Sequence, residues 1–202
     1  VNRMVTDSDG DSDATEGNLI SVNGAFGVLI HGSSDNVVAG NLIGTDVTGT
    51  AALPNNSSDS DSLGAGVGIR SGAQRNRIGT DGDGQSDEFE RNVISGNHGR
   101  GFRIVSNDTS HNVIAGNYIG VDIDALNALP NGTLGIGLLS GAHDNIIGID
   151  SDGDPHNVEG NVIAGNSSGG IVINGAGSSD NIIAGNFIGT NRDGADNLGN
   201  GA

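Results

Sequence analysis

Near its middle the sequence reads Asn112-Val-Ile-Ala-Gly-Asn117-Tyr-Ile-Gly120. Two further stretches are versions of the same string: Asn36-Val-Val-Ala-Gly-Asn41-Leu-Ile-Gly44 and Asn181-Ile-Ile-Ala-Gly-Asn186-Phe-Ile-Gly189. The three copies are about 70 residues apart, and a fixed internal period of this length indicates stacked repeats. The sequence therefore predicts a repeat protein and argues against an ordinary globular core.

Short apolar segments preceded by glycine occur twice in each repeat, about every 35 residues. They are Val28-Leu-Ile30, Val67-Gly-Ile69, Phe102-Arg-Ile104, Ile136-Gly-Leu138 and Ile171-Val-Ile173. The outer positions are always apolar and the middle one varies, which is the alternation of a strand with one buried face. Each segment is followed by two shorter apolar runs that begin with asparagine. Strands this short become stable when each pairs with its equivalents in the coils above and below.

These features predict an all-β fold, a parallel β-helix or β-solenoid of about six coils with three short strands each. Two coil types alternate, so that residues 1–202 form a single domain of about three double-coil repeats of about 70 residues. Residues 56–62 are rich in serine and aspartate and have no counterpart in the second repeat. We expect them to be a loop insertion that leaves the rod.

The recurrent strings N-x-I-x-G-N-x-I-G and G-x-x-I-x-x-G resemble the right-handed parallel β-helix repeats of secreted bacterial proteins, within the pectate-lyase-like superfold. The resemblance covers essentially the whole chain and implies a right-handed β-helix located outside the cell. It does not select an activity, because this superfold hosts lyases, hydrolases, epimerases, adhesins and inert spacers.

Each repeat also contains one acidic loop. The three copies are Asp7-Ser-Asp9-Gly10-Asp11-Ser-Asp13-Ala-Thr-Glu16, Asp81-Gly-Asp83-Gly84-Gln85-Ser-Asp87-Glu-Phe-Glu90 and Asp150-Ser-Asp152-Gly153-Asp154-Pro-His156-Asn-Val-Glu159. Alternating carboxylates around a tight glycine turn offer several hard oxygen ligands, as Ca²⁺ prefers, although the spacing is not that of an EF-hand. The alternative is a solvated acidic loop that holds no fixed ion.

We therefore predict Ca²⁺ as a cofactor of these loops. The predicted ligands are Asp7, Asp9, Asp11, Asp13 and Glu16 in the first loop, Asp81, Asp83, Asp87 and Glu90 in the second, and Asp150, Asp152, Asp154 and Glu159 in the third. The first loop should bind best, because Gln85 and His156 replace carboxylates in the other two.

Asparagines recur in three columns, namely Asn36/Asn112/Asn181, Asn41/Asn117/Asn186 and Asn18/Asn92/Asn161. They could contact a sugar, or they could stack inside the rod with amides hydrogen-bonded from coil to coil. We favour the internal ladder.

No complete catalytic constellation is present, and no catalytic residue is assigned. The outer face of the first strand of each coil carries no acid, and Arg70 and Arg103 form its best basic pair, which we interpret as surface charge. Asp154-Pro-His156 matches a D-P-H string of alginate epimerases, but no Tyr-Gly precedes it and it lies inside an acidic loop. Tyr118 shares a column with Leu42 and Phe187 and is expected to be a packing residue.

The second and third strands carry an apolar stripe. Its residues are Val37, Val113, Ile146 and Ile182, together with Leu42, Val93, Tyr118, Val162 and Phe187. If it were exposed, the stripe would mark lateral association. We expect instead that the long loops that contain Leu53, Leu129 and Leu198 cover it.

Composition limits the partners. The chain holds 25 acidic residues against 8 arginines and no lysine, for a net charge of −17, so nucleic acid and anionic membranes are not expected partners. No apolar stretch approaches the roughly 18 residues of a membrane span.

We expect an extracellular, calcium-stabilised structural or adhesive solenoid that stacks head to tail or continues in neighbouring repeats of a longer protein. The alternative is a carbohydrate-active enzyme of uronate lyase or epimerase type, or a polysaccharide-binding module, for which sugar-stacking aromatic residues are scarce.

Overall fold

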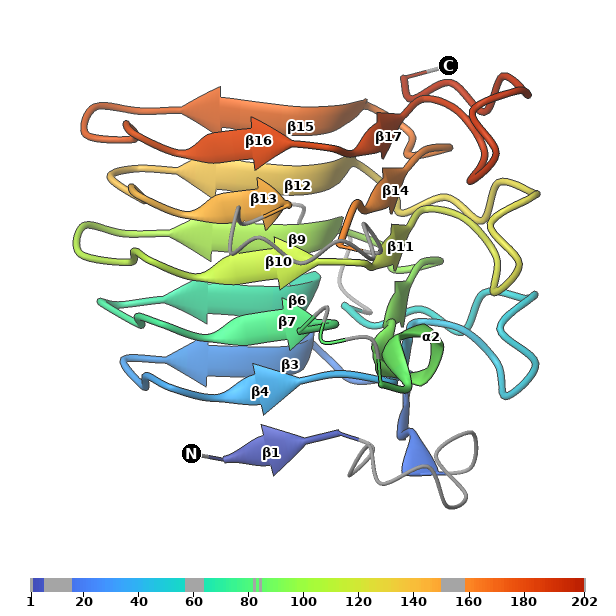
Figure 1. Ribbon diagram of the computed structural model, residues 1–202, viewed down its shortest axis with the longest axis horizontal. Coiled ribbons are helices and arrows are strands. Elements are labelled where there is room, and N and C mark those ends of the chain that lie inside the picture. Colours follow the sequence, from blue (N-terminus) through green and yellow to red (C-terminus); the bar gives the residue numbers. More distant parts are fainter. Residues whose placement is uncertain are drawn as a thin grey trace.

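The structure is a computed structural model that describes residues 2–5, 16–56, 64–81, 83, 85–149 and 159–201. Three all-parallel sheets stack into a β-solenoid, with the two chain ends at opposite ends of the stack (Figure 1). The predicted all-β solenoid is confirmed.

Sheet C contains the longest strands. They run in the order β15-β12-β9-β6-β3, and each pairs in parallel with its neighbours. Their bounds are Phe26–His31 (β3), Ala65–Arg70 (β6), Arg100–Val105 (β9), Leu134–Leu139 (β12) and Gly169–Asn174 (β15).

Sheets A and B are built from strands of two or three residues. Sheet A comprises β1 (Arg3–Met4), β4 (Val37–Val38), β7 (Arg77–Gly79), β10 (Val113–Ala115), β13 (Ile146–Gly148) and β16 (Ile182–Ala184). Sheet B comprises β2 (Leu19–Ile20), β5 (Leu42–Ile43), β8 (Val93–Ile94), β11 (Tyr118–Ile119), β14 (Val162–Ile163) and β17 (Phe187–Ile188). A short helix, α2 (Asp87–Glu90), ends the second acidic loop.

The chain makes about 4 turns, which it completes between β3 and β15. The expected number of about six coils was too high. Part of the difference lies at the start of the chain, where β1 and β2 extend sheets A and B but no described strand precedes β3 in sheet C. A coil was therefore counted there that the described residues do not close.

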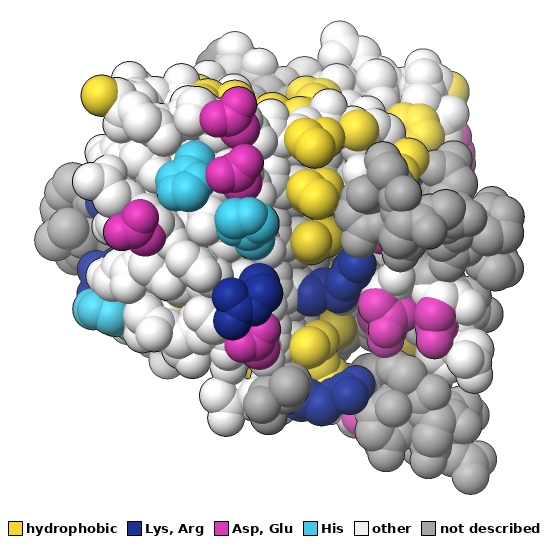
Figure 2. Space-filling view, turned by 60° about the vertical axis from the view of Figure 1, so that its left-hand side comes forward, with side chains coloured by type: hydrophobic (Ala, Val, Ile, Leu, Met, Phe, Trp, Pro, Cys, Tyr) yellow, Lys and Arg dark blue, Asp and Glu magenta, His cyan; other side chains and the backbone are white. Residues whose placement is uncertain are grey.

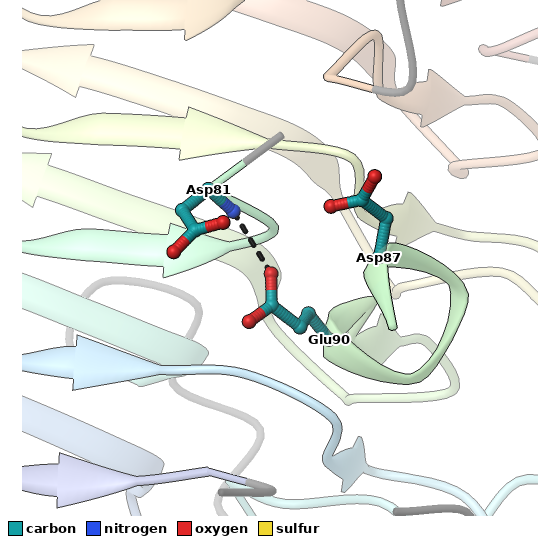
Figure 3. A group of neighbouring side chains, drawn as sticks. All are labelled: Asp81, Asp87 and Glu90. Atoms are coloured by element: carbon teal, nitrogen blue, oxygen red, sulfur yellow. Dashed lines mark hydrogen bonds between the residues drawn. The ribbon is translucent and has the colours of Figure 1, made fainter. Parts of the chain in front are cut away.

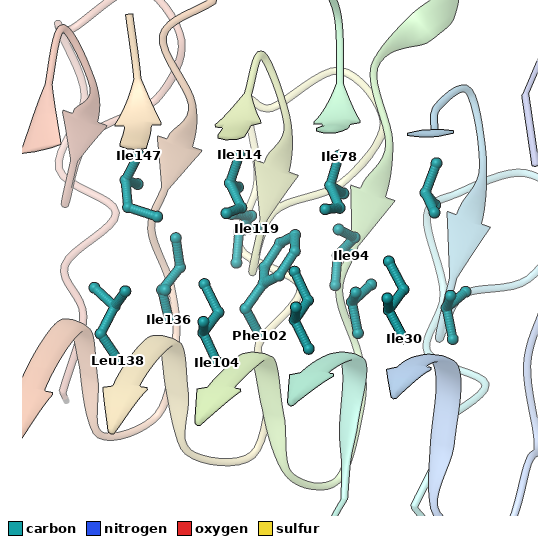
Figure 4. Packing of buried hydrophobic residues seen from close by; sticks show 14 of the residues in the cluster. Ile30, Ile78, Ile94, Phe102, Ile104, Ile114, Ile119, Ile136, Leu138 and Ile147 are labelled. Atoms are coloured by element: carbon teal, nitrogen blue, oxygen red, sulfur yellow. The ribbon is translucent and has the colours of Figure 1, made fainter. Parts of the chain in front are cut away.

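The core is a narrow column of isoleucines with one large ring in it (Figure 4). Ile78 and Ile114 from sheet A and Ile94 and Ile119 from sheet B point toward Phe102 of sheet C, and all are fully buried. Such stacking of like side chains follows from the in-register pairing of strands, because each residue lies against its own equivalent in the next coil. Burial of these side chains is the main apolar stabilisation of the rod.

The apolar stripe behaves differently on its two sheets. On sheet B, Val93, Tyr118 and Val162 are buried and pack with Val121 and Ala125 of the following loop. On sheet A the outer column stays at the surface, and Figure 2 shows it as a line of apolar side chains interrupted by arginines. In register order this column is Arg3, Val37, Arg77, Val113, Ile146 and Ile182. The expected cover is thus confirmed only in part on sheet B, where Leu198 packs with this cluster but Leu53 and Phe187 are 41% and 42% exposed, and it is wrong for sheet A.

Asparagine ladders and a candidate metal centre

Three ladders of asparagines run along the solenoid, one at each corner where the chain passes from sheet to sheet. Ladder 1 precedes the strands of sheet A and contains Asn2, Asn36, Asn76, Asn112, Asn145 and Asn181. Ladder 2 precedes the strands of sheet B and contains Asn18, Asn41, Asn92, Asn117, Asn161 and Asn186. Ladder 3 lies between sheets B and C and contains Asn23, Asn55, Asn97, Asn131, Asn166 and Asn200.

Within a ladder every rung has the same direction. The Nδ2 of Asn36 donates to Oδ1 of Asn76 at 2.7 Å, and the backbone N–H of Asn36 donates to the same oxygen at 3.0 Å. The backbone N–H can only donate, so its partner must be the amide oxygen, which fixes the orientation of the side chain. All three ladders donate from the earlier coil to the later one.

Each asparagine also satisfies the backbone of the corner. In ladder 2 the Nδ2 of Asn117 donates to the carbonyl oxygen of Ile78 at 2.9 Å and to that of Ala115 at 3.0 Å. Asn117 is fully buried, so without its side chain these carbonyl groups would be buried with fewer partners. The internal ladder that the sequence predicted is present, and it explains why asparagine recurs at the corners.

The sequence prediction of the ladders was correct for two corners and did not include the third. The columns that begin at Asn18 and Asn41 merge into one ladder, because coils of the two types alternate along it. Ladder 3 was missed. Its signal was the asparagine that ends each long loop, as in Pro54-Asn55 and Pro130-Asn131.

The second acidic loop brings three of its predicted ligands together. Oxygen atoms of Asp81, Asp87 and Glu90 all lie within 4.8 Å of one another (Figure 3). Asp81 is exposed, whereas Asp87 and Glu90 are only 5% and 6% exposed. Carboxylates this close repel one another, and a cation bound between them would relieve that repulsion.

The local chain path sets this geometry. Asp81 follows β7 directly, and α2 carries Asp87 and Glu90 on one turn of helix. The backbone N–H of Asp81 donates to Glu90 Oε2 at 2.9 Å, and the Thr80 hydroxyl donates to Asp87 Oδ1 at 2.9 Å. These two hydrogen bonds orient the carboxylates, as outer partners do around metal ligands.

The three residues fit a calcium ion. Ca²⁺ holds oxygen ligands at about 2.3–2.6 Å, so two ligands of one ion can be no more than about 5 Å apart. The 4.8 Å limit of this cluster meets that condition. The cluster supplies three of the six to eight oxygen ligands that Ca²⁺ takes, and water and backbone carbonyl groups commonly supply the rest.

The other predicted ligands are distributed as follows. Asp83 lies outside the cluster, and its carboxylate accepts the backbone N–H of Gln85 at 2.8 Å. Glu16 is half-buried at the end of the first loop. The remaining acids lie outside the described residues: Asp7, Asp9, Asp11, Asp13, Asp150, Asp152 and Asp154.

The last residues of the second and third acidic loops share a backbone role. The carbonyl oxygen of Glu90 accepts the N–H of Gly40 at 2.7 Å, and that of Glu159 accepts the N–H of Gly116 at 2.6 Å. Their side chains differ in surroundings, because Glu159 lies 3.5 Å from Nη1 of Arg77 and is 3% exposed. Position ten of the loop is thus a corner residue in two repeats, and in the second repeat it also joins the acidic cluster.

Tyr118 has the packing role that the sequence predicted. It is 6% exposed, and the guanidinium of Arg91 lies over its ring at 4.5 Å while Nη1 hydrogen-bonds the hydroxyl at 3.1 Å. Among the described residues, no helix is long and apolar enough to span a membrane.

No family model, no curated protein and no solved structure matches the chain. The structure itself defines the class, which is a parallel β-solenoid built from repeats.

Proposed function

We propose that the protein is an extracellular structural or adhesive solenoid whose coils continue by stacking, with calcium bound at its acidic loops. The resemblance of its repeats to those of secreted parallel β-helix proteins in the pectate-lyase-like superfold supports this proposal. The observation that carries it is the common direction of the three asparagine ladders, because it makes the two ends of the described rod complementary.

The last coil presents donors and the first presents acceptors. Nδ2 of Asn200 donates to the carbonyl oxygen of Ile163 and has a second hydrogen to offer, as does that of Asn181, which donates to Ala142. At the other end, the Oδ1 atoms of Asn2, Asn18 and Asn23 accept no hydrogen bond from the residues that the structure describes. A further coil could therefore extend all three ladders in register.

The core is also open at the last coil. Ile173, Ile183 and Ile188 are 47%, 38% and 48% exposed, although their counterparts one coil earlier are fully buried. Those counterparts are Leu138, Ile147 and Ile163. Another coil seated here would remove this apolar surface from water. The next coil of a longer polypeptide or the first coil of a second copy would have the required shape.

Sedimentation velocity of the purified chain tests stacking between copies. We expect species larger than the 20.1 kDa monomer, increasing with protein concentration. Asn200→Ala should shift the distribution toward monomer because it removes one end donor, whereas Asn174→Ala, an exposed residue on β15, should not. A monomer at every concentration would contradict stacking between copies.

The calcium part of the proposal is supported by the Asp81, Asp87 and Glu90 cluster. Extracellular calcium modules bind with dissociation constants of about 0.1–1 mM, which matches the concentrations outside cells. Bound calcium would compensate the clustered carboxylates and hold α2 against the end of β7, so it should stabilise the fold.

Thermal and chemical unfolding with and without calcium test this part. At tenfold excess over the dissociation constant, one site adds about 1.4 kcal/mol to the free energy of unfolding. Glu90→Gln should reduce the calcium-dependent gain, while Asp83→Asn, in the same loop but outside the cluster, should keep it. The assignment fails if calcium stabilises Glu90→Gln as much as the wild-type chain, or if it stabilises neither.

A further inference from the structure

The outer face of sheet C carries a group of arginines that the structural role does not require. Arg70 on β6 and Arg100 and Arg103 on β9 are three of the eight basic residues of the chain. Strand register places Arg103 opposite Gly68, so that Arg70, two residues further along β6, is its diagonal neighbour. In a chain with net charge −17, the gathering of cations on one face is unusual.

Neighbouring side chains lie over two glycines of this outer face. A Cβ at Gly68 would meet the ring of Phe26 at 2.6 Å, and one at Gly137 would meet Cδ of Arg100 at 3.4 Å. Both glycines are register partners of Arg103, one in each neighbouring strand. The guanidinium of Arg70 in turn lies 5.7 Å from the centre of the Phe26 ring. The side chains of Arg70 and Arg100 thus lie close to neighbouring groups of the sheet.

Arg70 and Arg103 have no acidic partner in the described part of the chain. Their Nε atoms are shielded from solvent and find no acceptor there. Burial, and then the charges of Arg100 and Arg70, lower the pKa of Arg103 below its ordinary value. A shielded N–H group without an acceptor is rare in native proteins, and beside other cations it indicates a missing anion.

We infer that Arg70 and Arg103 form a binding site for an oxyanion, a sulfate or carboxylate group, on the outer face of sheet C. The planar guanidinium offers two parallel N–H donors to such a group, and the guanidinium of Arg70 already lies against the Phe26 ring. The same oxyanion could be a free ion or a substituent of a polymer. The strong negative charge of the whole chain opposes a densely charged polyanion such as nucleic acid.

An NMR titration with sodium sulfate, at ionic strength matched by sodium chloride, tests the site directly. The chain has 8 arginines, few enough to follow each Nε–H signal separately. The Arg70 and Arg103 signals should shift with saturation in sulfate but not in chloride. Arg103→Gln should weaken binding at least about tenfold, the effect of losing one charge-assisted hydrogen bond.

The matched control is Arg75→Gln, which removes an exposed arginine that already pairs with Asp35. It should leave the sulfate-dependent shifts of Arg70 and Arg103 unchanged. Titration with acetate tests whether the site takes a carboxylate as well as a sulfate. Titration with dextran sulfate, with neutral dextran as the blank, tests whether it takes a sulfate that is part of a polymer. Binding of any of them that is lost in Arg103→Gln and kept in Arg75→Gln supports the site. Equal shifts in chloride, or unchanged binding by Arg103→Gln, would overturn it.

Because Arg103 lies beside other arginines, replacing it should have opposite effects on the melting temperature with and without a bound oxyanion. Without any oxyanion, Arg103→Gln should melt at the same temperature as the wild-type chain or higher. With saturating sulfate the order should reverse. A lower melting temperature for Arg103→Gln in both conditions would show a purely structural role for Arg103 and contradict the anion site.

Discussion

The corners of the coils and the outer face of sheet C both carry polar side chains, but only those at the corners repeat. At each corner an asparagine recurs in every described coil and bonds to its own equivalent. On the outer face, the position opposite Arg103 is leucine, glycine, glycine or valine in the other coils, and a charge occurs there once. In this solenoid, repetition marks what every coil needs in order to stack, and departures from it mark where a particular coil does something else.

Replacing a glycine with alanine at a corner and on the outer face should give the largest difference in stability between the two regions. Gly79 ends β7 at a corner with φ +104°, and a Cβ there would overlap the carbonyl oxygen of Ala115. Gly79→Ala should therefore lower the free energy of unfolding by about 4 kcal/mol or more, or prevent folding. Gly137→Ala on the outer face should change it by less than about 1 kcal/mol, since the new methyl group would make only ordinary contacts with the side chains of Arg100 and Leu139. Urea unfolding of both variants measures the difference, and similar losses would show that the corners are not special.

The next largest loss of stability is expected when a ladder asparagine is replaced. Asn117 accepts from Nδ2 of Asn92 at 2.8 Å and donates to Oδ1 of Asn161 at 3.0 Å. Asn117→Ala removes one hydrogen bond from each of these buried groups and from the Ile78 carbonyl, which should cost about 2–4 kcal/mol. Asn174→Ala on the exposed edge of sheet C should be nearly neutral. A loss below 1 kcal/mol for Asn117→Ala, measured by the same urea titration, would mean that water readily replaces the ladder.

The smallest effect should come from an exposed corner pair. A side-chain hydrogen bond from Arg75, with its charge as a lesser cause, holds the pKa of Asp35 below its ordinary value of 3.8. Since the folded-state pKa is the lower one, the pair stabilises the fold above pH 3.8, and this contribution is lost as the pH falls through the folded-state value. Asp35→Asn should melt slightly earlier than the wild-type chain near neutral pH and equally at strongly acidic pH. Asp180→Asn, at the same corner position in the last coil, provides the control in thermal melts across this range. If the difference in melting temperature between Asp35→Asn and the wild-type chain persists at strongly acidic pH, the ion pair is not its cause.

What the sequence predicted correctly depended on this repetition. Period-two alternation in segments such as Ile171-Val-Ile173 was sufficient to place inward and outward residues, because every coil gives the same answer. The cluster of Asp81, Asp87 and Glu90 was also within the predicted ligand set, since the loop repeats its carboxylates at fixed offsets. Calcium binding itself stays a prediction.

What the sequence did not show includes an interruption of the alternation that recurs in the described coils, at Gly27, Gly66, Gly101, Gly135 and Gly170. Gly101 and Phe102 are adjacent, yet both face the core, since a Cβ on Gly101 would meet the Ile119 side chain. This interruption of the alternation puts Arg100 on the same outer face as Arg103, and a strict period of two assigns it to the other side. The contact between Arg77 and Glu159 was equally hidden, because it joins coils whose spacing along the axis cannot be read from either residue alone.

The common direction of the asparagine rungs gives the rod an electrical axis. In a parallel sheet of this kind the backbone N–H and C=O groups point alternately up and down the stack, so their dipoles largely cancel. The side-chain amides do not cancel, because each directs its oxygen toward the beginning of the chain and its hydrogens toward the end. Their dipoles add as peptide dipoles do along an α-helix. Parallel rods lying side by side would therefore repel slightly more than antiparallel ones, and a suspension of stacked rods should align in an electric field and show transient birefringence.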